Sequence, residues 1–447
     1  MAAGIGLGIS MGWAVAKKGF SAVIQGLFAI LEARSTYFEN ANDSKLSVQG
    51  LETAGLLDKA SIVLTPTGYS EDAIHNVKPS SASFGDMSLV KNSTSTRVNE
   101  DGLVVTNAKD IPRIDYSKGS GAILTELSGV NIMKYSEAFN QTGTWVPQSN
   151  SNISTITTDD PRGNTTTVFT FEETGPGQFN LGFPGAISHT SGKGLGVSIW
   201  VKKVGGIGST GVFKIGKLYN MSEELETYIV GSEWQRVTWK STASAFASHM
   251  VLRGDAGQVF AIWGAQAESA GYGRPGTVSS YIPTSGSTVQ RVRDNYANGG
   301  GSALIGQSEG VLYFEGASLV DYQGGRAIAL SDGTAANRVV LFFDYAQAKI
   351  RTLVKDGSNN QTIFIQPIAD QTSFNKIAVK YKSGDIALWI NGTERQGGTG
   401  TPFAFTSPLT ELAFDQGNGS VHMDGFIKQV AVFKEALSDA ELTALTT

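Results

Sequence analysis

Short β-type stretches recur from residue 61 to the end of the chain, and they constrain the fold most. In several of them apolar and polar residues alternate, which places successive side chains on opposite faces and predicts a strand with one solvated face. Turn-forming residues separate the stretches, and glycine alone accounts for 54 of the 447 residues. Regular short strands punctuated by turns predict a mainly β chain of two consecutive sandwich or jelly-roll-like domains. The stretches are Ser61–Thr65, Gly102–Thr106, Thr165–Phe171, Gly196–Lys202, Trp234–Lys240, Val259–Gly264, Val311–Glu315, Ala327–Leu330, Val339–Phe343, Lys376–Tyr381, Ile386–Ile390 and Gly425–Phe433.

The charge balance and the absence of cysteine exclude several classes of function. The chain has 35 Lys and Arg against 40 Asp and Glu, a net charge of −5. This balance gives no electrostatic reason to expect a nucleic-acid partner. A chain without cysteine cannot form disulfides, thiolate zinc sites, iron–sulfur clusters or a cysteine nucleophile.

The first 34 residues are unusually apolar, but they do not fit a standard secretion or membrane signal. Residues 1–16 are small and apolar, and Lys17 and Lys18 follow this run instead of preceding it. The run is shorter than the roughly 20 residues that a membrane-spanning helix needs. Apolar residues between Ser21 and Arg34 recur near helical spacing. We interpret residues 1–60 as a part-helical attachment region that packs on another subunit or protein; a membrane-active segment and a local helical cap are the alternatives.

Two turn-rich stretches divide the remainder of the chain. One lies near Gly119–Gly121, and the other is the flexible sequence at Asn298–Ser302. We therefore expect a β-rich connecting module at 61–120, a central sandwich at 121–298 and a second sandwich at 299–447. A final helix is predicted at Ser438–Leu445, because Ser438 and Glu441 have the spacing of a capping box.

Three segments carry a resemblance to a known group of proteins. Thr96–Glu126 contains T-R-V-N-x-x-G-L followed by P-R-x-D-Y, and Asn131–Trp145 contains S-E-x-F and a later tryptophan. Ile262–Asn295 contains G-A-Q-x-E and S-Y-I-P-T-x-G-S-x-V-x-R-x-x-D. These segments resemble modules of tailed-phage virion proteins, with Ala267 where leucine is usual. The resemblance implies that the central sandwich is similar to a carbohydrate-binding module.

The last section, from about residue 305, resembles a concanavalin A-like or laminin-G-like sandwich. Lys376–Glu394 has the pattern of a hairpin that turns at Ser383–Asp385, and Met423–Leu442 that of a closing strand followed by the capped helix. The two resemblances together imply a fibre or surface appendage on the head or tail of a phage particle. They imply a homotrimer, made in the bacterial host cytoplasm, that attaches to other virion proteins through its N-terminus and binds host-surface glycan.

The alternative function is a glycan-degrading enzyme, such as a capsule depolymerase. A glycosidase needs two carboxylates on one sugar linkage, and the chain has no E-x-D strand motif. We interpret the cluster Glu223, Glu224 and Glu226 as a solvated edge. The histidines, none paired at helical spacing, are His75, His189, His249 and His422. We therefore expect no enzyme; a connector protein with no ligand is the third hypothesis.

Sugar binding needs an aromatic platform together with planar polar groups. Candidates in the last domain are Tyr322, Arg326, Tyr345, Trp389, Asn391 and Arg395, and in the central domain Trp145 and Tyr219. No cofactor is predicted. Calcium is an alternative at the loop carboxylates Asp332 and Asp415, for which simple Asx turns are the competing interpretation.

Overall fold

A computed structural model describes the backbone of the chain in two compact units. The residues described are 48, 50–66, 69–70, 73–78, 85–147, 150–175, 179–181, 187–188, 194–219, 222–241, 247–269, 278–297, 299–320, 325–344 and 348–447. Unit 1 comprises residues 1–92, 109–126 and 294–447, and unit 2 comprises residues 93–108 and 127–293. Each unit therefore combines segments that are distant in sequence. The boundaries expected from sequence stay predictions.

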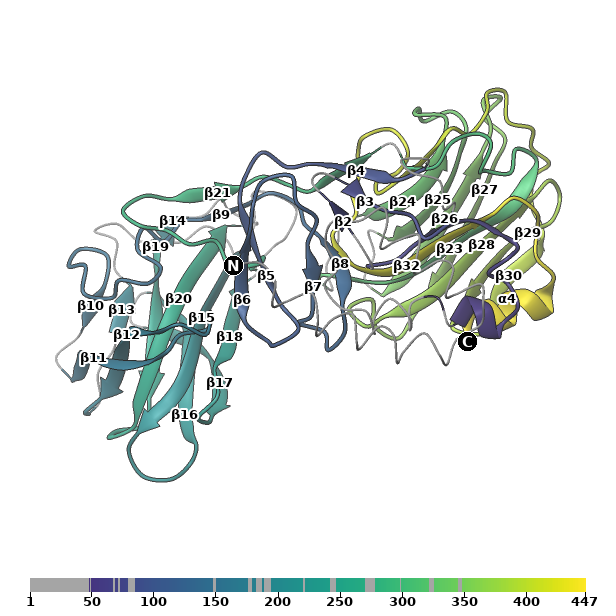
Figure 1. Ribbon diagram of the computed structural model, residues 1–447. Coiled ribbons are helices and arrows are strands. Elements are labelled where there is room, and N and C mark those ends of the chain that lie inside the picture. The colour runs from purple at the N-terminus through teal and green to yellow at the C-terminus, as the bar shows by residue number, and fades with distance from the viewer. Residues whose placement is uncertain are drawn as a thin grey trace, which may run out of the picture. The chain divides into compact units, whose positions relative to one another are not determined.

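Unit 1 is a sandwich of two large antiparallel sheets (Figure 1). The first contains, in order, β30 (Thr393–Thr399), β29 (Ile386–Ile390), β28 (Asn375–Lys382), β23 (Glu309–Ser318), β32 (Gly425–Phe433), β8 (Ala122–Thr125) and β7 (Ile114–Asp115), and β1 (Ala60–Leu64) also pairs with β32. The second contains β27 (Gln361–Pro367), β26 (Lys349–Lys355), β25 (Arg338–Phe343), β24 (Arg326–Ser331) and β31 (Glu411–Ala413). A smaller sheet contains β2 (Tyr69–Ser70), β3 (Ala73–Ile74), β4 (Met87–Val90) and β22 (Asn295–Ala297).

Alternate residues of the two large sheets form the core of unit 1. Phe314 of β23 meets Phe343 of β25 edge to face, with ring centroids 5.9 Å apart. Buried apolar residues of both sheets surround this pair, and their removal from water supplies the main driving force for the sandwich. The helix α4 (Asp439–Thr446) packs on a separate apolar cluster, where Leu442 is buried. Its N-terminus carries the predicted capping box between Ser438 and Glu441.

A buried ion cluster explains one of the sequence motifs in unit 1. Arg113 has no exposed side-chain surface; it donates to Glu126 at 2.6 Å and also pairs with Asp294. Burial opposes the charge of the guanidinium, but Asp294 and Glu126 outweigh this effect and raise its pKa. Arg113 and Glu126 of the segment Thr96–Glu126 therefore meet Asp294 of the segment Ile262–Asn295, up to 181 residues away in sequence.

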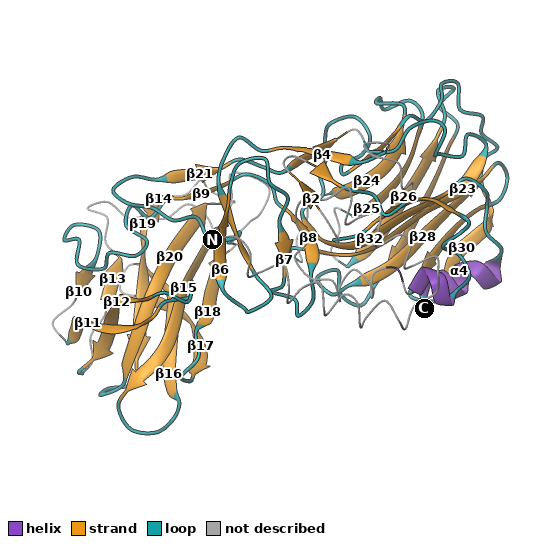
Figure 2. Cartoon of the chain, in the orientation of Figure 1, coloured by secondary structure: helices purple, strands orange, loops and turns teal. Residues whose placement is uncertain are grey.

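Unit 2 contains a second sandwich (Figure 2). One sheet contains β11 (Ser151–Asp159), β12 (Thr165–Glu173), β20 (Val259–Ser269), β15 (Leu195–Gly205) and β18 (Gln235–Ser241). The other contains β10 (Val146–Pro147), β13 (Phe179–Leu181), β19 (Ala247–Gly254), β16 (Gly211–Tyr219) and β17 (Ser222–Val230), with β14 (Ile187–Ser188) beside β19. Two ribbons complete the unit, β5 (Ser95–Val98) with β6 (Val104–Asn107), and β9 (Gly129–Asn131) with β21 (Val289–Arg291). Phe213 of β16 meets Phe260 of β20 in its core, 5.2 Å between ring centroids.

The mainly β fold with jelly-roll-like sandwiches, predicted from the alternation, is confirmed. The predicted hairpin at Ser383–Asp385 joins β28 and β29, and the predicted final helix is present. The expected attachment region lies mostly in residues 1–47, outside the described residues. Among the described residues, no helix has both the length and the apolar character needed to cross a bilayer.

Candidate functional site

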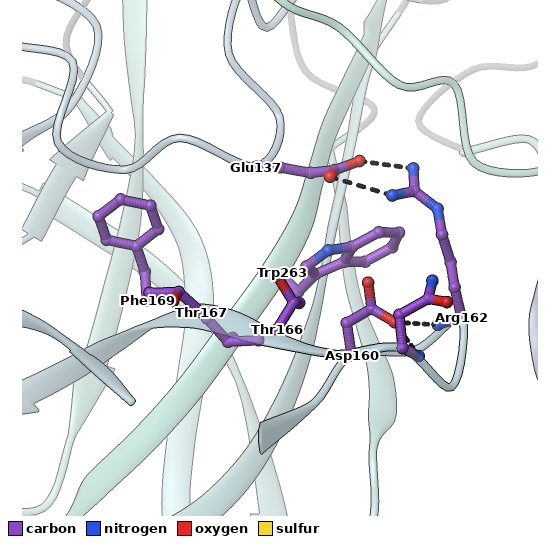
Figure 3. A pocket seen from close by; sticks show the side chains of 9 residues that line it. Glu137, Asp160, Arg162, Thr166, Thr167, Phe169 and Trp263 are labelled. Carbon is purple, nitrogen blue, oxygen red and sulfur yellow. Dashed lines mark hydrogen bonds and ion pairs between the residues drawn. The ribbon is translucent and has the colours of Figure 1, made fainter. Parts of the chain in front are cut away.

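A polar pocket with one aromatic wall lies on the five-stranded sheet of unit 2 (Figure 3). Its volume is about 290 Å³. We call it the Trp263 pocket, and its lining residues are Glu137, Asp160, Arg162, Asn164, Thr166, Thr167, Val168, Phe169 and Trp263. They come from the loop after β9, the turn between β11 and β12, strand β12 itself and strand β20.

Strand alternation and a bulge together direct Trp263 away from the sandwich core. Ile262 belongs to the core of unit 2, so its neighbour Trp263 faces outward. Trp263 is paired with Trp200 of the neighbouring strand β15. The pairing of β15 with β20 is irregular next to this pair, between Ser198 and Trp200. Gly264 sits at this irregularity with φ of +64°, a left-handed conformation that glycine tolerates. A β-carbon there would lie 2.9 Å from the Trp200 ring, so the close packing also requires glycine.

The turn between β11 and β12 folds over this outward face and is fixed at several points. Asp160 accepts hydrogen bonds from the backbone N–H groups of Arg162 and Asn164, which closes an Asx-type turn. The indole N–H of Trp234 donates to the carbonyl of Asp159 at 2.7 Å. Lys202 donates to the same carbonyl at 3.1 Å, and partial burial lowers the pKa of this lysine although Asp159 opposes the shift. The turn is therefore held in place before any ligand arrives.

Arg162 connects the turn to the aromatic wall. Its guanidinium lies over the Trp263 ring, 4.6 Å from the centroid, and forms two hydrogen bonds to Glu137, at 2.7 and 3.2 Å. Tyr281 donates its hydroxyl proton to Glu137 at 2.8 Å. Burial, with a further contribution from Glu137, raises the pKa of Tyr281 well above its ordinary value. Tyr281 therefore stays a neutral donor that orients Glu137 toward Arg162.

The arrangement can recognise hydroxyl groups but lacks a free acid–base pair. Arg162 and Asn164 supply planar donors, Glu137 and Asp160 supply acceptors, and Trp263 provides an apolar wall. Both carboxylates are already engaged, Glu137 by Arg162 and Tyr281, and Asp160 by its own turn. Among the described residues, no cluster of three or more His, Asp or Glu side chains could hold a metal ion.

The structure separates the sugar-binding residues predicted for the last domain. Trp389 is buried, 6% exposed, in the apolar cluster under α4. Arg326 is 2% exposed, with its Nε 3.7 Å from an oxygen of Asp424. Asn391 sits in the turn after β29 with φ of 48°, and its side-chain Oδ1 accepts a hydrogen bond from the backbone N–H of Lys376. Arg395 is exposed on β30.

Four other predicted residues have mixed outcomes. Tyr322 and Tyr345 lie outside the described residues. Trp145 is buried in the core of unit 2, 1% exposed, so it offers no exposed ring for a sugar. Tyr219 ends strand β16, and its side chain is not described.

The two candidate calcium carboxylates cap turns. Asp332 accepts from the backbone N–H and the hydroxyl of Thr334, and hydrogen bonds lower its pKa although burial opposes the shift. Asp415 accepts from the backbone N–H groups of Gly417 and Asn418. Both residues therefore show the Asx-turn geometry that competed with the calcium hypothesis.

Neither the histidines nor the acidic cluster belongs to the described residues that line the Trp263 pocket. His75 contacts Asp86 at 3.3 Å, and His422 lies 4.0 Å from Asp415. His189 lies outside the described residues, and of His249 only the backbone on β19 is described. Glu223, Glu224 and Glu226 lie on β17, and Glu226 is exposed.

Sequence reasoning did not select the residues that line the Trp263 pocket, although a signal was present. Glu137 is the acidic residue of the S-E-x-F motif, and Trp263 directly precedes the G-A-Q-x-E motif. The motifs therefore contained the two walls of the pocket. Arg162 carried no signal of its own, because only the folded turn brings it to Glu137.

Comparisons with known proteins bear on the last section of the chain. Residues 319–443 match a family model described as the concanavalin A-like lectin/glucanases superfamily. No curated protein matches the chain.

Solved structures with a similar fold cover about a third of the chain. The Ruminococcus gnavus IT-sialidase CBM40 bound to alpha2,3 sialyllactose has 18% sequence identity and a TM-score of 0.29, covering 33% of this chain and 86% of that chain. The leech intramolecular trans-sialidase has 17% identity and a TM-score of 0.28, covering 32% of this chain and 23% of that one. The botulinum neurotoxin type G receptor binding domain has 11% identity and a TM-score of 0.24, covering 34% and 41%. Likeness at this level carries no argument about function. Residues 319–443 are therefore similar to the concanavalin A-like lectin/glucanases superfamily, and they lie in the sandwich of unit 1.

Proposed function

We propose that this protein binds carbohydrate without cleaving it and that the Trp263 pocket is a sugar-binding site. The observation that carries the proposal is the convergence of Arg162, Glu137 and Asp160 beside the indole of Trp263 in a pocket of about 290 Å³. Ligand pockets combine an apolar wall with a few well-placed polar groups, and this volume lies at the small end of their usual range. The lectin-type sandwich at 319–443 supports the same class of ligand.

The engaged carboxylates favour binding over hydrolysis. A glycosidase needs one carboxyl group that protonates the leaving oxygen and a second that acts as nucleophile or base. Glu137 is tied to Arg162 and Tyr281, and Asp160 accepts two backbone hydrogen bonds from its own turn. Both groups act as fixed acceptors that position their neighbours. A glycan-degrading enzyme is the alternative outcome of the test.

Replacing Arg162 tests the proposal with little disturbance to the fold. Arg162 and Glu137 are 29% and 33% exposed, and such surface pairs contribute about 1 kcal/mol or less to stability. We expect Arg162→Ala to lose glycan binding by at least about tenfold, because a planar donor of the pocket is removed. The measurement is isothermal titration against glycans that the wild-type protein retains on an array of bacterial surface polysaccharides.

Lys240→Gln is the matched control, because it removes an exposed positive charge from β18 of the same unit. It should bind like the wild type. Equal binding by wild type and Arg162→Ala would remove the Trp263 pocket from the proposal.

We propose further that the protein is a virion component of a tailed phage, a head or tail fibre or other surface appendage. The support is the resemblance of Thr96–Glu126, Asn131–Trp145 and Ile262–Asn295 to modules of such proteins. In this proposal the chain is made in the bacterial host cytoplasm, forms a homotrimer, attaches to other virion proteins through residues 1–60 and presents its sandwiches to host-surface glycan. Immunogold labelling of intact particles tests the location, and unlabelled particles would contradict it. Light scattering tests the trimer.

A further inference from the structure

The five-stranded sheet of unit 1 has an unusual concentration of basic residues on the face that points away from its sandwich core. Alternation on β26 places Lys349, Arg351, Leu353 and Lys355 together on this face, while Ile350 and Val354 enter the core. Arg338 of β25 lies directly opposite Lys355 in the antiparallel register. We call Lys349, Arg351, Lys355 and Arg338 the basic face.

The charges of the basic face are only partly compensated. Arg351 lies 3.4 Å from Asp344 and stacks over Phe342, 4.1 Å from the ring centroid. Arg338 donates to the backbone carbonyl of Gln416 at 3.0 Å, and no ion pair joins it to a carboxylate of the described residues. Its Nε is buried without a hydrogen-bond partner in the described part of the chain. Glu411 of β31 is aligned with Arg338 across the sheet, but it is two strands away. Its carboxylate accepts a hydrogen bond from the hydroxyl of Ser331.

The positive charges of the basic face repel one another. Like charges directly opposite each other in a sheet are destabilising, and Arg338 faces Lys355 in this way. Burial, and then the nearby positive charge of Arg351, lowers the pKa of Arg338. An anion placed between these groups would relieve the repulsion and could accept from the Nε of Arg338.

An apolar row separates the two arginines on the same face. Val340, Leu353 and Ile363 are paired across β25, β26 and β27, but Val340 and Leu353 are buried in an apolar cluster and Ile363 alone of the three is exposed. These three residues lie between the cross-strand pair of Arg338 with Lys355 and that of Arg351 with Phe342. The two pairs are about 13 Å apart along the strands. Ile363 and Ile365, the latter opposite Arg351, are 45% and 48% exposed. Two arginines beside a pair of exposed isoleucines suit a chain of sugar rings that carries repeated negative charges.

We propose that the basic face binds an acidic polysaccharide, with Arg338 and Arg351 holding carboxylate or sulfate groups and the exposed Ile363 and Ile365 contacting the sugar rings. This site would add a second surface to the proposed function. The inference rests on that function in one respect, which is the choice of a polysaccharide as the molecule that carries the negative charges. Residues 338–363 lie within the lectin-type match at 319–443, which favours polysaccharide over an acidic protein segment.

The test is titration of the full chain with three polymers of similar length: polygalacturonate, which carries carboxylates, dextran sulfate, and uncharged dextran. We expect binding of at least one acidic polymer that weakens with added salt. Arg338→Gln combined with Arg351→Gln should reduce its affinity by at least about tenfold. The charge-matched control is Lys240→Gln with Lys434→Gln, two exposed lysines away from the basic face, and it should bind like the wild type.

Three results would overturn the inference: no acidic polymer binds the wild type, the arginine double variant binds as well as the wild type, or polyglutamate binds as tightly as the acidic polysaccharides. Arg162→Ala, measured in parallel, should leave polyanion affinity within about twofold, so failure of the Trp263 pocket and failure of the basic face give different patterns. Arg338→Gln alone should keep or raise the midpoint of urea unfolding, because it removes a repulsive pair. A lowered midpoint would show that Arg338 has a structural role.

Discussion

The five-stranded sheets of the two units have similar inward faces and very different outward faces. In each unit the inward residues meet the opposite sheet through aromatic contacts, Phe314 with Phe343 in unit 1 and Phe213 with Phe260 in unit 2. The outward face of unit 2 is aromatic and is covered by the turn at Asp159–Asn164. The outward face of unit 1 carries the basic face and two exposed isoleucines. The two sandwiches therefore share one kind of core but differ outside it, where one sheet is packed under a turn and the other presents charged and apolar side chains to solvent, and these outward faces carry the proposed binding sites.

The largest expected effect concerns Trp263, which is outward-facing yet only 4% exposed. Trp263→Ala should destabilise unit 2 by about 3–5 kcal/mol, because it leaves a cavity beside Trp200 and Tyr281. Ile365→Ala on the outward face of unit 1 should change stability by about 0.5 kcal/mol or less. Urea unfolding followed by tryptophan fluorescence measures the first effect, since unit 2 contains Trp145, Trp200, Trp234, Trp239 and Trp263, five of the seven tryptophans. Circular dichroism measures the second. Equal losses would contradict the distinction between the two faces.

A smaller effect is expected at Gly264, where a bulge sets the position of the aromatic face. Gly264→Ala should cost about 1–3 kcal/mol, because alanine is strained at φ of +64° and its β-carbon approaches the Trp200 ring. Gly384 of unit 1 is a matched control, because its φ is +78° and a β-carbon added there would meet no atom within 4 Å. Its replacement by alanine should cost only the backbone strain, about 1 kcal/mol. Equal unfolding midpoints for the two variants would show that Trp200 moves aside freely.

The smallest of the three effects concerns the acid sensitivity of unit 1. Hydrogen bonds from Lys59 and then from Ser438 lower the pKa of Glu441 to about 2, from an ordinary value of 4.5. A lowered carboxyl pKa stabilises the folded state above the ordinary value, and this contribution is lost as the pH falls from about 4.5 to about 2. Because Glu441 is partly solvated, we expect Glu441→Gln to cost about 1 kcal/mol or less at neutral pH.

Urea midpoints of wild type and Glu441→Gln between pH 2 and pH 7 measure this effect. The two should converge toward pH 2, where the wild-type carboxyl becomes protonated. A difference that stays constant over the range would mean that the lost contact does not depend on the charge of Glu441.

Alternation and capping were sufficient to predict much of the fold. The stretch at Gly425–Phe433 became β32 with the expected bounds, and the Ser438–Glu441 capping box begins α4. These features are local, so neighbouring residues determine them. Trp389 shows the limit of such reasoning, because alternation alone does not say which face of β29 is covered, and here α4 contributes to that cover.

The Trp263 pocket depends on features that are not local. Glu137, Arg162 and Trp263 come from three separate elements, and their meeting depends on strand register, on the bulge at Gly264 and on the turn that folds over the sheet. The basic face depends equally on register, since Arg338 and Lys355 are 17 residues apart in sequence and opposite each other in the sheet. Pairing between distant strands cannot be read from the alternation of one strand.

The central claim is that the protein holds sugar in the Trp263 pocket without breaking glycosidic bonds. The most direct measurement incubates wild type, Arg162→Ala and Glu137→Gln with a polysaccharide that the wild type retains, and records bound polymer and released reducing ends in the same samples. We expect the wild type to retain the polymer, both variants to lose it, and reducing ends to stay at the level of buffer alone. Reducing ends that rise with time for the wild type and stop rising for Glu137→Gln would contradict it.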